Sequence, residues 1–294
     1  MEKFNGRNAD MKKLTALLCA FTLLLTLASF FTACNHDKPS EGLEFQLNPG
    51  GASYSVIGLG TCKDSRIVVP STYEELPVTE IGAAAFYDTS IKSVVLPEGI
   101  TSIEAWAFEK CKKLTSVALP EGLTSIGYGA FYTCDKIKSL KIPSTVKNID
   151  GKAFASCGGL TEILLPDSVT TIGDGAFSDC YNVKKLIFGQ NLKSIGSGAF
   201  RSCWSIRNVT VTGSVPRIPP NAFEDCRALV NLTIPRSVVN IADSALRGCE
   251  SLTTLTYSGK KSDFLRILRE PNWKAESALK EVVCSDGVIL LPET

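Results

Sequence analysis

The stretch Ile126-Gly127-Tyr128-Gly129-Ala130-Phe131-Tyr132-Thr133-Cys134 decides the fold, because the chain keeps repeating it. A fixed period of this kind indicates a solenoid, in which each repeat is one small unit stacked on its neighbours. One step between copies is 22 residues and the others are 23, which aligns one aromatic column: Phe86, Phe108, Phe131, Phe154, Phe177, Phe200 and Phe223, with Leu246 in the eighth place.

The residues before each copy predict a short strand. In Leu114-Thr115-Ser116-Val117-Ala118-Leu119-Pro120, apolar residues are separated by polar or small ones, and the proline ends the strand because it cannot donate to a continuing ladder. We expect Gly127 to allow a tight bend, Ala130 to fit where space is short, and Phe131 to fill the core. Stacking is obligatory, since one repeat cannot offset its own chain entropy.

The full repeat, Leu-x-x-Val/Ile-x-Leu-Pro-x-x-Leu/Val-x-x-Ile-Gly-x-x-Ala-Phe-x-x-Cys, closely resembles the BspA-type bacterial leucine-rich repeat. The resemblance covers nearly all of residues 43–294 and includes Gly60-Thr61-Cys62 and Val283-Cys284-Ser285-Asp286-Gly287. It implies a curved leucine-rich repeat solenoid of the α/β repeat class, capped at both ends. We expect one sheet of short parallel strands, with irregular or short helical convex segments. Gly189, Thr212 and Pro219-Pro220 depart from the pattern, so the later repeats should be less regular.

The chain divides into five predicted segments: a signal peptide at 1–33, with Met11 as an alternative start; a lipidated tether at 34–42; an N-terminal cap and degenerate first repeat at 43–80; the array of period 23 at 81–257; and a C-terminal cap at 258–294. In the N-terminal cap we expect a hairpin around the turn residues 48–51. In the C-terminal cap we expect a helix over 260–270, a buried Trp273, and a terminal hairpin around 285–287.

The N-terminal segment has the pattern of a secretory signal, with Met11-Lys12-Lys13 before an apolar run that ends in small residues. Phe31-Thr32-Ala33-Cys34 resembles a bacterial lipobox, which implies lipidation of Cys34. The alternatives are an uncleaved transmembrane anchor, since about 20 apolar residues can span a bilayer, and ordinary cleavage. All three place the remaining chain outside the cytoplasm, and we expect a lipid-anchored protein of the bacterial cell envelope, at the cell surface.

Composition excludes several function classes. The net charge of +1 leaves no electrostatic footprint for nucleic acid. The single histidine, His36, removes Ser-His-Asp hydrolysis, Cys-His proteolysis and histidine-ligated metal sites. We find no phosphate-binding glycine loop, zinc-protease helix or nucleophile elbow, and therefore predict no catalytic residue, no cofactor and no metal.

The 11 cysteines suggest a specific role, because seven of them occupy one column three residues after the aromatic position. Disulfides within the column and a metal–thiolate site are both open alternatives. We favour a buried, reduced ladder, since free cysteine packs as a small hydrophobe and parallel stacking aligns the Cβ vectors, whereas a disulfide needs a dihedral near 90°.

The outward side chains of the predicted strands form the candidate binding face. It mixes basic residues with exposed apolar ones and consists of Lys92, Lys138, Lys141, Glu162, Leu164, Lys184, Lys185, Ile187 and Arg207. Such a face suits an acidic protein or a glycan, with a host surface or matrix molecule among the candidates. A solvated sheet face without a ligand is the alternative interpretation.

These observations favour a non-enzymatic envelope protein that uses the sheet face for protein or glycan recognition or adhesion. Two alternatives stay open. A parallel β-helix enzyme acting on polysaccharide has a similar period, and a purely architectural spacer needs no ligand. The proline-ended repeat and the missing cluster of acids and bases favour binding over the enzyme.

Overall fold

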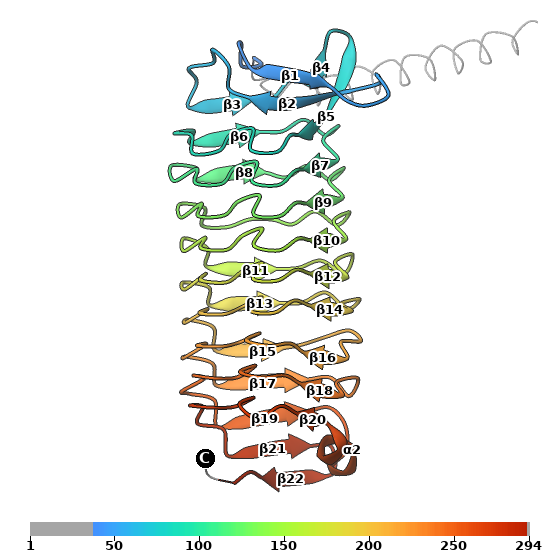
Figure 1. Cartoon of the computed structure of the whole chain (residues 1–294), viewed down its shortest axis with the longest axis vertical. Coiled ribbons are helices and arrows are strands. Elements are labelled where there is room, and N and C mark those ends of the chain that lie inside the picture. Colours follow the sequence, from blue (N-terminus) through green and yellow to red (C-terminus); the bar gives the residue numbers. More distant parts are fainter. Residues whose placement is uncertain (1–37, 293–294) are drawn as a thin grey trace, which may run out of the picture. The chain divides into compact units, whose positions relative to one another are not determined.

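The computed structural model describes residues 38–292 of the chain. The predicted signal segment and Cys34 lie outside these residues. From Pro39 onward the chain forms one compact unit, in which turn after turn stacks along one axis (Figure 1). Within the described residues, no helix is long and apolar enough to cross a membrane.

The predicted strands form a first row along the solenoid, and the neighbouring strands that pair do so in parallel (Figure 1). The row consists of β3 (Arg66–Val68), β6 (Ser93–Val95), β8 (Ser116–Ala118), β11 (Glu162–Leu164), β13 (Lys185–Ile187), β15 (Asn208–Thr210), β17 (Asn231–Ile234), β19 (Thr254–Tyr257) and β21 (Glu281–Cys284). The predicted strand at residues 138–141 is not formed, and Leu140 there is only partly buried.

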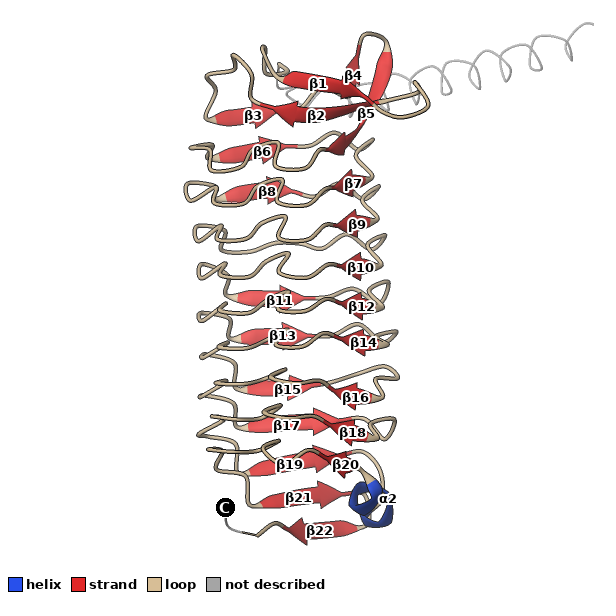
Figure 2. Cartoon of the chain, in the orientation of Figure 1, coloured by secondary structure: helices blue, strands red, loops and turns tan. Residues whose placement is uncertain are grey.

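Each turn also contributes a second strand, so the expectation of one parallel sheet was wrong (Figure 2). The second row consists of β2 (Tyr54–Gly58), β5 (Leu76–Ile81), β7 (Ser102–Ile103), β9 (Ser125–Ile126), β10 (Asn148–Ile149), β12 (Thr171–Ile172), β14 (Ser194–Ile195), β16 (Arg217–Ile218), β18 (Asn240–Ile241) and β20 (Leu268–Arg269). Its isoleucines face the core while their neighbours face solvent, for example in β9 and β12. Two-residue strands carry too little alternation to be recognised from sequence.

The third side of each turn carries the part of the opening nonapeptide that follows Ile126, and within the described residues of the array it contains no strand. Backbone hydrogen bonds still join the turns there, such as those from the Phe131 amide to the Ala153 carbonyl (2.7 Å) and from the Gly129 amide to the Gly151 carbonyl (2.9 Å). The phenylalanine rings stack in one continuous column, with neighbouring centroids 5.0 to 5.6 Å apart. Each ring is almost fully buried, which contributes about 1.5–3 kcal/mol per side chain.

Gly127 serves a different purpose from the predicted bend. Its backbone is not in the left-handed region. A Cβ atom there would lie 2.9 Å from the Ala105 nitrogen, so the glycine permits close approach of two turns. The left-handed conformation falls instead at Gly129 and Thr133, both with φ of 59°. The predictions for Ala130 and Phe131 are confirmed, since both are fully buried.

The two strand rows share one break, between β13 and β15 and between β14 and β16, in addition to the interruption of the first row between β8 and β11. In the regular turns, the second row is joined by bonds such as that from the Lys193 amide to the Thr170 carbonyl (2.9 Å) and from the Gly196 amide to the Ile172 carbonyl (2.8 Å). Pro216 and Pro219 occupy the equivalent positions one turn later and have no N–H to donate. We call this place the proline junction.

The two ends are closed by the expected hairpins. β1 (Glu44–Leu47) pairs antiparallel with β2, and β4 (Thr72–Tyr73) adds to β5. At the other end β22 (Gly287–Leu290) pairs antiparallel with β21, and Trp273 is buried. The helix predicted over 260–270 is shorter: α2 spans Lys261–Arg266, and the residues after it form β20, which pairs with β18 and extends the second row.

Candidate functional site

The candidate binding face is built by the first strand row. In β11 and β13 the middle residues, Ile163 and Leu186, are buried, so the flanking side chains point away from the core. The parallel register sets Glu162 opposite Lys185 and Leu164 opposite Ile187. Side chains at matched positions of neighbouring strands therefore form continuous columns on the surface.

All nine predicted face residues belong to this side of the solenoid, and all are exposed except Glu162, which is half-buried. The structure brings four of them together on β11 and β13, where Leu164 (38% exposed) and Ile187 (46% exposed) form an apolar pair. Arg207 lies on the far side of the proline junction from this pair. Lys138 and Lys141 lie in the interruption between β8 and β11, and Lys92 directly precedes β6.

The charges of the face are not all equally available. The Lys141 Nζ lies 2.8 Å from the Glu121 Oε1. Hydrogen bonds from Lys141 and Ser144 hold the pKa of the Glu121 carboxyl below its usual range. In the part of the chain that the structure describes, Lys184, Lys185 and Arg207 form no ion pair. These three cations are free to meet an acidic partner. Lys185 lies on β13 and Lys184 directly precedes it, next to the apolar pair, while Arg207 directly precedes β15, across the proline junction.

The cysteine column fills the core, as expected for a reduced ladder. Its seven members are fully buried and free. Each thiol also donates to the carbonyl of the aromatic residue one turn earlier, for example from the Cys134 Sγ to the Phe108 oxygen (3.1 Å) and from the Cys203 Sγ to the Phe177 oxygen (3.3 Å). The sequence did not indicate this hydrogen-bonding role.

Burial also makes the thiols unreactive. It raises the pKa of Cys180 and of Cys249 to about 12, and it also raises the pKa of Cys157 well above its ordinary value. The thiolate is the nucleophile and the metal ligand, so a thiol held protonated is inert. Within residues 38–292, no group of three or more His, Cys, Asp or Glu side chains is arranged to hold a metal ion.

Exposed aromatic pairs were not predicted. Trp106 meets Tyr128 edge-on with centroids 5.8 Å apart, and Tyr181 lies 5.2 Å from Trp204. Both tryptophans are nearly half exposed. These residues occupy variable positions of the repeat, so a sequence signal was available: an aromatic residue where most copies carry a polar or small one.

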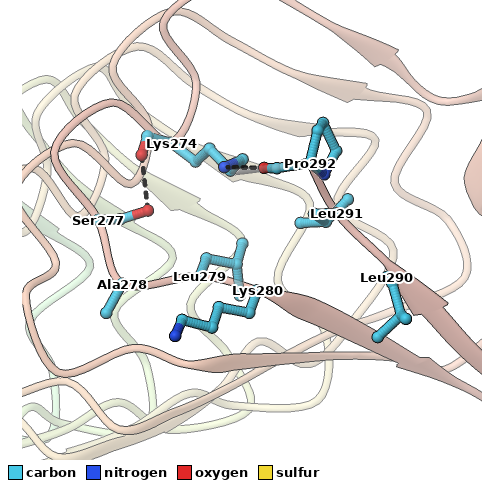
Figure 3. A pocket seen from close by; sticks show the side chains of 8 residues that line it. All are labelled: Lys274, Ser277, Ala278, Leu279, Lys280, Leu290, Leu291 and Pro292. Atoms are coloured by element: carbon cyan, nitrogen blue, oxygen red, sulfur yellow. Dashed lines mark hydrogen bonds between the residues drawn. The ribbon is translucent and has the colours of Figure 1, made fainter. Parts of the chain in front are cut away.

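A hollow of about 390 Å³ lies at the C-terminal end, where the terminal hairpin meets the preceding loop (Figure 3). Two of its polar side chains are already engaged, because the Lys274 Nζ donates to the Pro292 carbonyl (3.4 Å) and the Ser277 Oγ donates to the Lys274 carbonyl (2.6 Å). The hollow is therefore a joint between cap elements, without convergent free polar groups.

Comparison with known proteins identifies the family to which the repeat belongs. The family model described as "BspA type Leucine rich repeat region" matches residues 79–203 and 147–266, with six copies. No curated protein matches the chain. A leucine-rich repeat protein from Bacteroides ovatus is 23% identical with a TM-score of 0.69, over 85% of this chain and 72% of that one, which shows a shared fold.

A leucine-rich repeat protein of T. pallidum is 26% identical over 74% of this chain and 81% of that one, with a TM-score of 0.44. The leucine-rich repeat implies a protein-binding or surface role, without indicating a particular ligand. The repeat, its two strand rows and the family match together establish that this chain belongs to the BspA-type leucine-rich repeat family.

Proposed function

We propose that the chain is a non-enzymatic binding protein of the bacterial cell envelope that recognises an acidic protein surface through the first strand row. One observation carries the proposal: the unpaired cations Lys184, Lys185 and Arg207 lie on the same face as the exposed apolar pair Leu164 and Ile187. The centre of a protein interface is typically apolar, and complementary charge at its rim speeds association and selects the partner.

The rigidity of the face supports this proposal. The strands β11 and β13 pair in parallel with each other, and the residues beneath their outward side chains, Ile163 and Leu186, are buried. A surface that is already ordered loses little conformational entropy when a partner binds. A solenoid also presents one long continuous surface, which suits a partner larger than a small molecule.

The exported location and the anchor rest on the sequence pattern. The apolar segment after Met11-Lys12-Lys13 directs the chain out of the cytoplasm, and a lipid on Cys34 holds it at the cell surface. A host surface or matrix protein is then within reach. Metabolic labelling with a fatty-acid analogue tests this part: wild type incorporates the label and Cys34→Ser does not.

The binding face is tested on an array of purified extracellular-matrix and serum proteins, using the full chain in mild detergent. The triple variant Lys184→Glu/Lys185→Glu/Arg207→Glu should weaken capture about tenfold or more, with a melting temperature close to that of wild type, because exposed charges contribute little to stability.

The matched control is Lys147→Glu/Lys193→Glu, which reverses exposed lysines that directly precede β10 and β14 of the second strand row. It should leave capture unchanged. Equal losses in both variants, or an array on which wild type captures nothing, contradict the proposed face. The two alternatives predict other results: a polysaccharide-acting enzyme releases reducing ends from its substrate, and an architectural spacer captures no soluble protein.

A further inference from the structure

A second hollow of about 390 Å³ lies beside the binding face, at the pair Gly158-Gly159. Asp135, Lys136 and Lys138 line it from the turn before, and Tyr181 and Asn182 line it from the turn after. The hollow exists because the glycine pair has no side chains where the neighbouring turns carry Asp135-Lys136 and Tyr181-Asn182.

The surroundings require both glycines. A Cβ atom on Gly158 would overlap the Tyr181 ring, and one on Gly159 would overlap the Asp135 carbonyl. The Asn182 Nδ2 donates to the Gly158 carbonyl (2.7 Å), which fixes the amide at the rim. Close packing therefore sets the floor of the hollow at Gly158 and Gly159, while exposed side chains of the turn before form its rim.

An aromatic ledge continues from the hollow along the solenoid. The Tyr181 ring covers Gly158, and the Trp204 ring lies 5.2 Å from it, tilted by 33°. The guanidinium of Arg227 lies 5.7 Å from the centre of the Trp204 ring. Trp204 nevertheless remains 47% exposed. An aromatic face carries negative potential, so it attracts C–H groups that bear partial positive charge.

The polar lining carries both signs of charge. Asp135 only accepts hydrogen bonds when ionised, and Lys136 and Lys138 only donate. Within residues 38–292 none of these three forms an ion pair. A hydroxyl group both donates and accepts, so a ligand with many hydroxyls can satisfy such a lining, whereas an anion or a cation meets one repulsive partner. A pyranose combines hydroxyl groups with an apolar C–H face.

We propose that the Gly158-Gly159 hollow and the Tyr181–Trp204 ledge form a binding site for a neutral, pyranose-containing glycan. One sugar ring packs on the ledge, and the hydroxyls of the next meet Asp135, Asn182 and Lys136. The site goes beyond the proposed protein-binding face, because Lys138 is the one residue that the lining of the hollow shares with the predicted face. The ledge residues Tyr181 and Trp204 follow the third side of their two turns.

The test titrates the full chain in mild detergent with neutral hexasaccharides of glucose, mannose, xylose and N-acetylglucosamine, and with heparin and polygalacturonate as acidic probes. Isothermal calorimetry should find a neutral ligand with a Kd of about 0.1–1 mM. Trp204→Ala and Tyr181→Ala should each weaken binding about tenfold or more. The melting temperature of Trp204→Ala should stay near that of wild type, because this side chain is half exposed.

Trp106→Ala is the matched control, since Trp106 is 44% exposed and also lies beside a tyrosine. It should change the Kd less than about twofold. Three results overturn the site: no neutral probe binds at about 5 mM, Trp106→Ala loses as much affinity as Trp204→Ala, or only the acidic probes bind and salt abolishes the binding.

The charge-reversed variant separates this inference from the proposed protein-binding face. Lys184→Glu/Lys185→Glu/Arg207→Glu should keep glycan affinity, because none of these residues lines the hollow. Trp204→Ala should keep protein capture. Glycan binding that depends on the three cations and not on Trp204 assigns the sugar to the strand face and overturns the ledge.

Discussion

The regular turns and the proline junction differ in how their backbones are joined. Between β12 and β14, the Lys193 and Gly196 amides donate across the second row (2.9 and 2.8 Å). Between β14 and β16, Pro216 and Pro219 leave both bonds unmade. The third side crosses the junction intact, since the Phe200 amide donates to the Ala222 carbonyl (3.0 Å) and the Phe200 ring stacks between Phe177 and Phe223.

This difference shows that the strand rows and the hydrogen-bonded third side have separate roles. The strand rows present the outward columns and can be interrupted. The third side, with its phenylalanine stack and thiol donors, holds the turns together where the strands do not. The predicted face spans the junction, with Lys185 before it and Arg207 after it. The spacing of these cations therefore depends on the third side.

The largest effect should come from raising the pH, which acts on the thiol row of the third side. The Cys180 thiol has a pKa of about 12 in the folded state because it is buried, against about 8.5 in an unfolded chain. Above pH 8.5 the unfolded state loses the proton first, so stability falls as pH rises through the folded value.

Between the unfolded pKa of about 8.5 and the folded pKa, each of the seven thiols lowers the free energy of unfolding by up to about 1.4 kcal/mol per pH unit. Urea midpoints should therefore drop steeply between about pH 8 and pH 10. Cys180→Ala should flatten the slope, which separates the thiols from titrating lysines and tyrosines. A midpoint independent of pH in this window would count against buried, reduced cysteines.

The next largest effect should come from truncating a stacked ring. Phe200→Ala and Phe154→Ala should each cost about 3–5 kcal/mol, because both side chains are fully buried. Only Phe200→Ala should uncouple the two halves, since the strand rows do not join them there. Replacing Trp204 and Trp273 by phenylalanine leaves Trp106 to report the first half by fluorescence, while circular dichroism reports the whole. Coincident transitions in Phe200→Ala would argue against the junction as a weak point.

A smaller effect should follow from copying the junction into a regular turn. Lys193→Pro removes the bond from the Lys193 amide to the Thr170 carbonyl (2.9 Å). We expect a loss of about 0.5–1.5 kcal/mol in the free energy of unfolding, since one backbone hydrogen bond is lost. The Ser194 amide still donates to the same carbonyl (3.2 Å), so no buried acceptor is left without a partner. Lys193→Ala keeps the amide and should lie within about 0.5 kcal/mol of wild type. Equal losses in the two variants would assign the effect to the side chain.

The smallest effect on stability should come from the reverse change, Pro216→Lys. The new hydrogen bond contributes about 0.5–1.5 kcal/mol, and the freer unfolded chain offsets about 0.4–1 kcal/mol of it. The informative readout is hydrogen exchange of the new amide at position 216. Exchange of this amide should become as slow as that of the Lys193 amide. Immediate exchange would show that the two prolines alone do not account for the break between the turns.

Sequence predicted the solenoid well because its inward columns repeat. Phe131, Ala130 and Cys134 recur at one spacing, and burial of their side chains explains why. The hairpins and the burial of Trp273 could also be predicted, since turn residues and alternation mark them. The second strand row was missed because it is set by backbone contacts between turns, as at β9 and β10, and a pair such as Ser125-Ile126 has no readable pattern.

The candidate sites were harder to predict from the sequence. The predicted columns correctly placed Leu164 and Ile187 on one exposed face, because alternation in a strand fixes which side chains point outward. The Gly158-Gly159 hollow was not predicted, since it depends on how the Tyr181 ring lies over a glycine of the previous turn. Contacts of this kind depend on side-chain direction, which spacing alone does not fix.

Residue-resolved hydrogen exchange in the native protein tests the central contrast most directly. The Lys184 amide donates to the Thr161 carbonyl (2.8 Å), and the Phe200 amide donates across the junction (3.0 Å). The Arg207 amide donates to no backbone acceptor within residues 38–292. We predict slow exchange at Lys184 and Phe200 and exchange faster by orders of magnitude at Arg207. Equal protection at Lys184 and Arg207, or fast exchange at Phe200, would contradict a solenoid whose strand rows open at the proline junction while its third side holds.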